Sequence, residues 1–196
     1  MTQEKQEKLN RKLLEAAKGG ELAKVRELIK SGAQVDAVDD FECHHPLHLA
    51  SEEGHLPVVR FLLEAGAKVD AVNRYDEQPL LLAASMGRLP VARFLLGAGA
   101  KVDAADNKGR QALHYADRLS VVKFLLSAGS DPMAKDNDGK TAVDTIGEAG
   151  NPRVIALLKE WSDPECREKM RQAANARDIR AHWKKIAGHI PSGPRM

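Results

Sequence analysis

Residues 45–63 read HPLHLASEEGHLPVVRFLL, and residues 78–96 repeat them as QPLLLAASMGRLPVARFLL. Two weaker copies follow, QALHYADRLSVVKFLL at 111–126 and TAVDTIGEAGNPRVIALL at 141–158. A self-similar pattern with a period of about 33 residues is typical of proteins built from tandem copies of one small supersecondary unit. The chain is therefore predicted to be a tandem array.

Each copy has the pattern of two short helices joined by a glycine turn. Pro46 and Pro79 suit the first turn of a helix, because the missing N–H costs nothing there. That helix is predicted to end at Gly54 or Gly87, and the second helix places Val, Phe and Leu at helical spacing. The linking stretches are rich in Asp, Asn and Gly, which predicts a turn or short hairpin. Two such helices bury their apolar faces only against neighbouring copies, so the predicted fold is an all-α solenoid.

The stretch Pro46-Leu47-His48-Leu49-Ala50, followed by Gly54-His55, resembles the ankyrin repeat and its T-P-L-H-x-A signature. In that family a finger-like turn precedes two antiparallel helices. The resemblance covers roughly residues 9–160 and implies an ankyrin-repeat α-solenoid over residues 1–161. Its five units are expected at 9–38 (an N-terminal cap), 39–72, 73–105, 106–135 and 136–161 (a degenerate copy).

Residues 162–196 lie outside the repeats and are predicted to form a basic helical extension with a disordered end. They hold eight Lys or Arg against four Asp or Glu. Apolar residues recur there at helical spacing, at Ile179, Trp183, Ile186 and Ile190. Two interpretations stay open: a cap over the end of the stack with Trp183 as its anchor, or a segment presented to a partner.

Composition excludes several classes. Hydrophobic residues make up 43% of the chain but aromatic residues only 4%, which predicts packed helices with a core of Leu, Val, Ile and Ala. A net charge of +2 is too small to imply a nucleic-acid or membrane partner. The start of the chain has no apolar signal region, and the two cysteines form no spaced pair. A cytoplasmic protein is expected, and a secreted effector or a processed periplasmic form stays open.

Two departures from the repeat pattern affect structure. The 106–135 unit is three residues short, which deletes the glycine turn between its helices. We expect either a tightened helix–turn–helix or a notch at Asp117 and Arg118 shaped for a partner. The signature Thr survives only as Thr141 and is replaced elsewhere by His45, Gln78 and Gln111. The predicted consequence is imperfect capping and some lost stability.

A cluster of candidate metal ligands lies in residues 43–55: Cys43, His44, His45, His48 and His55. The resemblance implies that His48 and His55 belong to the repeat scaffold. Cys43, His44 and His45 are adjacent and do not easily converge on one tetrahedral ion. A metal or redox site at these three residues is kept as a weaker alternative. This finger is one residue longer than its neighbours, with the extra residue within 41–45.

No nucleophile–base arrangement or phosphate-binding loop is present in the sequence, so a non-enzymatic protein without cofactor or metal is predicted. The resemblance implies a monomeric module that binds another protein through its finger tips and inner face. Such a module is interpreted as an inhibitor or immunity-type protein, or alternatively as an effector or scaffold acting on a host protein. The candidate partner-binding residues are Phe41, Glu42, His44, Glu52, Glu53, Arg74, Tyr75, Glu77, Ser85, Met86, Asn107, Lys108 and Arg110. Charge along this surface is predicted to run from acidic at Glu42 to basic at Lys108, Arg110 and Arg118.

Overall fold

The computed structural model describes residues 3–147, 150–165 and 168. Helices and connecting loops make up this part of the chain, together with an isolated bridge between Ala105 and Gln111. The helices are α1 (Gln3–Lys18), α2 (Leu22–Lys30), α3 (Pro46–Glu53), α4 (Leu56–Glu64), α5 (Pro79–Ser85), α6 (Leu89–Gly97), α7 (Ala112–Tyr115), α8 (Leu119–Ser127), α9 (Ala142–Ile146) and α10 (Pro152–Ser162).

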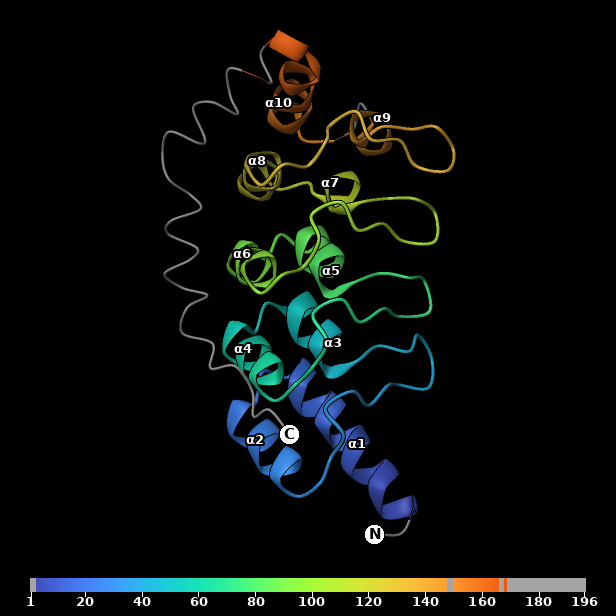
Figure 1. The fold of residues 1–196 in the computed structure, drawn as a ribbon, viewed down its shortest axis with the longest axis vertical. Coiled ribbons are helices and arrows are strands. Elements are labelled where there is room, and N and C mark those ends of the chain that lie inside the picture. Colours follow the sequence, from blue (N-terminus) through green and yellow to red (C-terminus); the bar gives the residue numbers. More distant parts are fainter. Residues whose placement is uncertain (1–2, 148–149, 166–167, 169–196) are drawn as a thin grey trace.

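The helices form two stacked layers. Figure 1 shows α1, α3, α5, α7 and α9 in one column beside the projecting loops, and α2, α4, α6 and α8 in a second column on the side away from those loops. We call these the finger-side layer and the far layer. Each of the first four units thus supplies one helix to each layer, and its main contacts are with the neighbouring units. The predicted all-α solenoid is confirmed.

Proline and glycine fix the ends of the helices as the sequence predicts. Helices α3 and α5 begin at Pro46 and Pro79. Gly54 closes α3 in the left-handed region at φ 85°, which a residue with a Cβ rarely adopts. A Cβ at Gly54 would also lie 2.8 Å from Cδ of Arg88, a side chain of the next unit. The turn that joins the two helices is therefore part of the contact between units.

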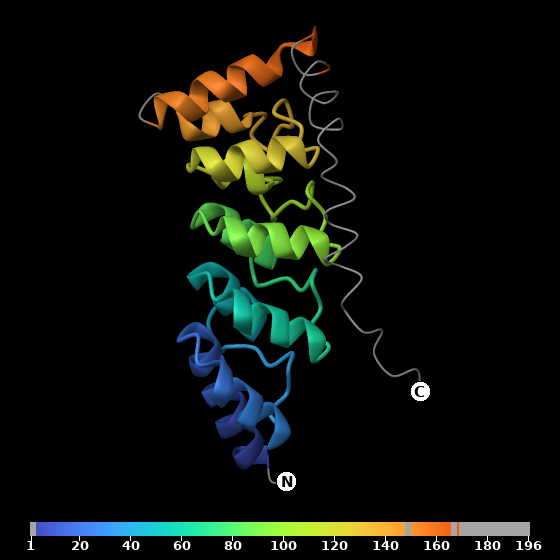
Figure 2. The ribbon, with the colours of Figure 1, turned by 90° about the vertical axis from the view of Figure 1, so that its left-hand side faces the viewer.

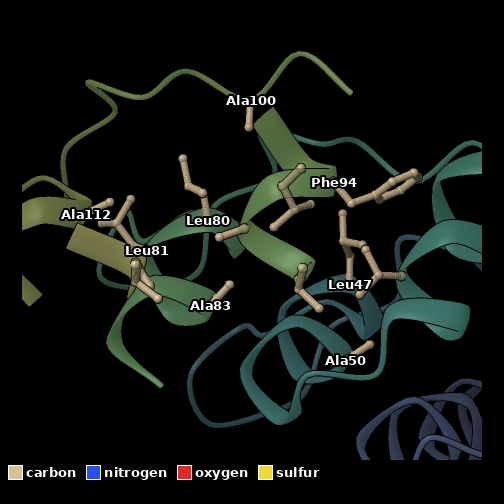
Figure 3. Packing of buried hydrophobic residues seen from close by; sticks show 14 of the residues in the cluster. Leu47, Ala50, Leu80, Leu81, Ala83, Phe94, Ala100 and Ala112 are labelled. Carbon is tan, nitrogen blue, oxygen red and sulfur yellow. The ribbon is translucent and has the colours of Figure 1, made fainter. Parts of the chain in front are cut away.

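Small and branched aliphatic side chains fill the space between units. Leu47, Leu80 and Leu113 occupy equivalent positions in successive units and are 0–1% exposed. Figure 3 shows Leu47, Leu80 and Leu81 among the packed side chains, with Ala50 and Ala83 where the helices approach closely. The buried hydrophobic core of the described residues contains Leu, Val and Ala as predicted, but also Phe94, Phe124 and Trp161. Ile29 and Ile146 are partly buried and pack against this core.

A regular series of cation–π contacts links the helices of the far layer, which faces the viewer in Figure 2. In each contact the guanidinium of one unit lies over the phenyl ring of the next. The pairs are Arg26 over Phe61 (4.7 Å from guanidinium carbon to ring centroid), Arg60 over Phe94 (4.6 Å) and Arg93 over Phe124 (4.9 Å). These contacts connect four successive units along one face.

The shortened 106–135 unit is a tightened helix–turn–helix, one of the two expected outcomes. Helix α7 has four residues, and the backbone leaves the helical region at Ala116 (φ −77°, ψ 112°). Asp117 and Arg118 remain exposed beside this turn, with 66% and 71% of their side chains accessible. The array still continues through α8, whose apolar residues are buried.

Helix α10 closes the described array. Val154, Leu158 and Trp161 are buried on one of its faces and join the common core. Within the predicted helical extension, Pro164, Glu165 and Glu168 have helical backbone. The remaining predictions for the basic extension, including the Trp183 anchor, lie outside the described residues. None of the described helices combines the length and apolar content that spanning a bilayer requires.

Candidate partner-binding surface: the finger tips

Four loops project from the finger-side layer. We call them finger 1 (39–44), finger 2 (73–77), finger 3 (106–110) and finger 4 (136–140). In each finger the N–H of the first residue donates to the carbonyl of the last, at 2.9–3.1 Å. The side-chain Oδ1 of that first residue, an Asp or Asn, accepts two further N–H groups of the loop. Side-chain acceptors of this kind hold a polar loop in one conformation.

The tips of the fingers are joined by single backbone hydrogen bonds. Arg74 N–H donates to Glu42 carbonyl at 2.8 Å, and Asn107 N–H donates to Tyr75 carbonyl at 2.9 Å. In fingers 3 and 4 the equivalent bond runs from the Asn137 N–H to the Lys108 carbonyl, at 2.9 Å. Glu42, Tyr75 and Lys108 are therefore equivalent positions, and the finger tips form one continuous row.

Finger 1 carries the additional residue. It has six residues, whereas the other fingers have five. Since Glu42 is equivalent to Tyr75, the insertion lies between Asp39 and Glu42, and of the predicted stretch 41–45 only Phe41 fits this register. The insertion leaves the side chain of Phe41 80% exposed, more than any other large hydrophobic residue in the described chain. Covering an aromatic ring this exposed with another molecule would remove a large apolar surface from water.

Most of the other predicted residues also lie on the outside. Tyr75 is 41% exposed and Met86 is 47% exposed. Glu42, Arg74, Asn107 and Lys108 are exposed at the finger tips, and Glu52, Glu53, Glu77 and Ser85 are half-buried nearer the helices. The row thus presents two aromatic side chains on neighbouring fingers, followed by a cation at Lys108.

His44 does not face outward. It is 8% exposed, and its Nε2 lies 2.9 Å from Nδ2 of Asn73 in finger 2. Its ring stacks at 5.7 Å on that of His48, which is fully buried. His44 therefore shapes finger 1 from within, and sequence alone did not indicate this direction.

Arg110 is not a free cation. Its Nη2 lies 3.1 Å from Oδ2 of Asp106, and its guanidinium covers the ring of Tyr115 at 4.5 Å. Burial acts to raise the pKa of Asp106, but the hydrogen bond from the Tyr115 hydroxyl and the N–H groups of Arg110 and Lys108 lower it below its usual value. Arg118 is likewise paired, with Asp117 at 3.7 Å. Of the three predicted cations, only Lys108 lacks an ion pair among those found in the described chain.

Arg88 is a contact that sequence reasoning missed. Its Nε donates to the carbonyl of Glu52 at 2.9 Å, and its Nη2 lies 3.8 Å from Glu53. His55, at the equivalent position after the turn glycine, lies 2.9 Å from the carbonyl of Lys18 through Nε2. The sequence signal that could have revealed this contact is that Arg88 and His55 both directly follow the turn glycine of their units. The predicted acidic pair at Glu52 and Glu53 is thus partly neutralised by the following unit.

The histidines of finger 1 and α3 have structural partners. His48 Nδ1 accepts the N–H of His45 at 3.1 Å, and its Nε2 donates to the carbonyl of Glu77 at 3.0 Å. His48 thus belongs to the repeat scaffold, as the resemblance implies, and it joins its unit to the next one. His, Cys, Asp and Glu side chains of the described residues include no group of three arranged to hold a metal ion.

Comparison with known proteins agrees with this architecture. A family model of ankyrin repeats in three copies matches residues 13–106 and 70–136, which together exceed half of the chain. A search of the curated proteins found no match. Proteins of this kind generally serve as protein–protein interaction modules. The matched residues include the tips of fingers 1, 2 and 3 and residue 136 of finger 4. The chain belongs to the ankyrin-repeat family.

Proposed function

We propose that this protein is a non-enzymatic binding module that holds a partner protein through its finger tips and finger-side layer. Phe41 is the anchor of this surface. Its exposure, on a finger lengthened by one residue, is the observation that carries the proposal. Exposed aromatic side chains on a rigid support are the residues that most often dominate interface energy.

The support beneath Phe41 favours rigid recognition. The backbone is fixed at Phe41 and at the residue after it, since Asp39 Oδ1 accepts the N–H of Phe41 at 3.1 Å and of Glu42 at 2.8 Å. Glu42 is bonded in turn to finger 2. A protruding ring held in this way fills an apolar pocket on the partner at little cost in conformational entropy. Occlusion of such a pocket is how an inhibitor or immunity-type protein acts, and this is the role we propose.

The test compares two exposed apolar residues. Phe41→Ala removes the proposed anchor, and Met133→Ala is a matched control because Met133 is 45% exposed but outside the fingers. Full-length protein captures its partner from a cell extract, the partner is identified and purified, and each variant is titrated against it. We expect Phe41→Ala to weaken binding by more than tenfold with unchanged thermal stability, as for a hot-spot residue. Equal affinities for wild type and Phe41→Ala would contradict the proposal.

A further inference from the structure

The neutral form of His44 links finger 1 to finger 2. Asn73 is 4% exposed, and its Oδ1 accepts the N–H groups of Tyr75 at 2.9 Å and Glu77 at 3.0 Å. This fixes the orientation of the amide, so that Nδ2 donates to His44 Nε2 at 2.9 Å. Because Nε2 accepts, the proton of neutral His44 resides on Nδ1.

The opposite edge of the ring faces two carboxylates of its own finger. Nδ1 lies 3.6 Å from Asp39 Oδ2 and 3.6 Å from Glu42 Oε2, which is too long for a hydrogen bond but suits an ion pair with a charged ring. Burial acts to raise the pKa of Asp39, and the N–H groups of Glu42 and Phe41 lower it below its usual value. Asp39 is therefore ionised at neutral pH.

The other titratable neighbours belong to α3 and finger 2. His48 stacks on His44 and stays neutral, because burial lowers its pKa to about 3. The His45 ring stacks on His48 at 5.3 Å. In finger 2 the Glu77 carboxylate accepts the second hydrogen of Asn73 Nδ2 at 2.8 Å. Both hydrogens of that amide are thus already assigned to partners.

Finger 3 shows what a permanently charged base does at the same position. Arg110 is the last residue of finger 3, as His44 is of finger 1, and it bonds the carboxylate of Asp106, the first residue of its own finger. Contact with finger 4 is made instead by Asn137, which donates to the carbonyl of Asn107 at 3.1 Å. A charged base at this position is therefore accommodated within its own finger.

We infer that His44 is a pH-dependent link that couples finger 1 to finger 2 when neutral and releases it when protonated. Protonation places a hydrogen on Nε2, which then faces the donor Nδ2 of Asn73. Asn73 cannot turn over without withdrawing its oxygen from two buried N–H groups. The charged ring instead pairs with Asp39 and Glu42, as Arg110 pairs with Asp106.

The consequence for recognition rests on the proposed function. Phe41 lies one residue before Glu42, whose carbonyl accepts the N–H of Arg74. Uncoupling the fingers therefore loosens the support of Phe41. Binding through Phe41 is therefore expected to be weaker at pH 5.0 than at pH 7.5.

The test uses the free, full-length protein and NMR measurement of amide–solvent exchange at pH 7.5 and 5.0. The reporter is the Arg74 N–H, and the Asn107 and Asn137 N–H groups are internal controls because they make the same bond between the other fingers. Dividing the exchange rate of the Arg74 N–H by the rates of the control N–H groups cancels the general effect of pH on amide exchange. We expect the relative rate of Arg74 to rise roughly tenfold in acid, the effect of losing one buried hydrogen bond.

Two substitutions separate charge from shape. His44→Gln keeps an acceptor toward Asn73 and does not titrate, so its relative Arg74 rate should be low at both pH values. His44→Arg copies Arg110, so its rate should be high at both. If the relative Arg74 exchange rate of the wild-type protein stays unchanged while the NMR signals of the His44 ring titrate, the inference is overturned. It is also overturned if the Arg74 exchange rate still responds to pH in His44→Gln. Phe41→Ala should keep the wild-type response, so this result is independent of whether Phe41 binds a partner.

Discussion

Substituting leucine for His48 should make folding less sensitive to acid. His48 is fully buried and neutral, and burial lowers its pKa to about 3 from 6.5. Between these values the unfolded chain binds a proton that the folded protein excludes, so stability rises with pH and is lost as pH falls below 6.5. The slope is about 1.4 kcal/mol per pH unit. Wild-type protein at pH 4.5 should therefore have lost about 3 kcal/mol through this one side chain.

Leucine is the matched replacement because Leu81 occupies the same position in the next unit and is 1% exposed. Urea unfolding followed by circular dichroism gives the free energy of unfolding of both proteins at pH 7 and 4.5. His48→Leu should be less stable at pH 7, since two hydrogen bonds are lost. Its loss between the two pH values should be about 3 kcal/mol smaller than that of wild type. Carboxylates common to both proteins cancel, so equal losses would refute this reasoning.

The other predictions concern contacts between units and helix capping. Arg60→Ala should lower the free energy of unfolding of the wild-type protein by about 0.5–1 kcal/mol. In a Phe94→Leu background the same substitution should have no effect, because the ring under Arg60 is absent. An equal effect in both backgrounds would contradict this. Gln78→Thr should raise the free energy of unfolding by about 1 kcal/mol, because the buried Gln78 Oε1 finds no partner in the described chain and Thr141 caps α9. An unchanged urea midpoint would show that Gln78 costs nothing.

The repeat pattern was sufficient to predict the fold because its signals act locally and recur. Proline at a helix start and glycine in the turn determine the same backbone conformation in each copy, as at Pro46, Pro79 and Gly54. The shortening of the 106–135 unit was also visible in the sequence, but the tightened connection was one of two expected outcomes, and the structure shows which of them occurs.

The directions of finger side chains were not predictable in this way. A five- or six-residue loop has no periodicity, and its conformation follows from hydrogen bonds to the first Asp or Asn. His44 therefore turned inward toward Asn73, and Arg110 turned to Asp106 and Tyr115. Phe41 was predictable as a surface candidate because it is an aromatic residue in an otherwise polar turn, but its place in the lengthened part of the finger required the bonding register of the tips.

The Arg-over-Phe contacts have a consequence for how the array can change during evolution. A central unit carries both halves of the contact, as in VRFL at 59–62 and ARFL at 92–95. A tandem duplication copies both halves together, so the new unit matches its neighbours on either side from the moment it arises. The corresponding stretches at the ends read VREL at 25–28 and IALL at 155–158, which lack one or both halves. Copies can thus be gained or lost where both halves are present, whereas the series stops at 122–125, which reads VKFL and lacks the arginine.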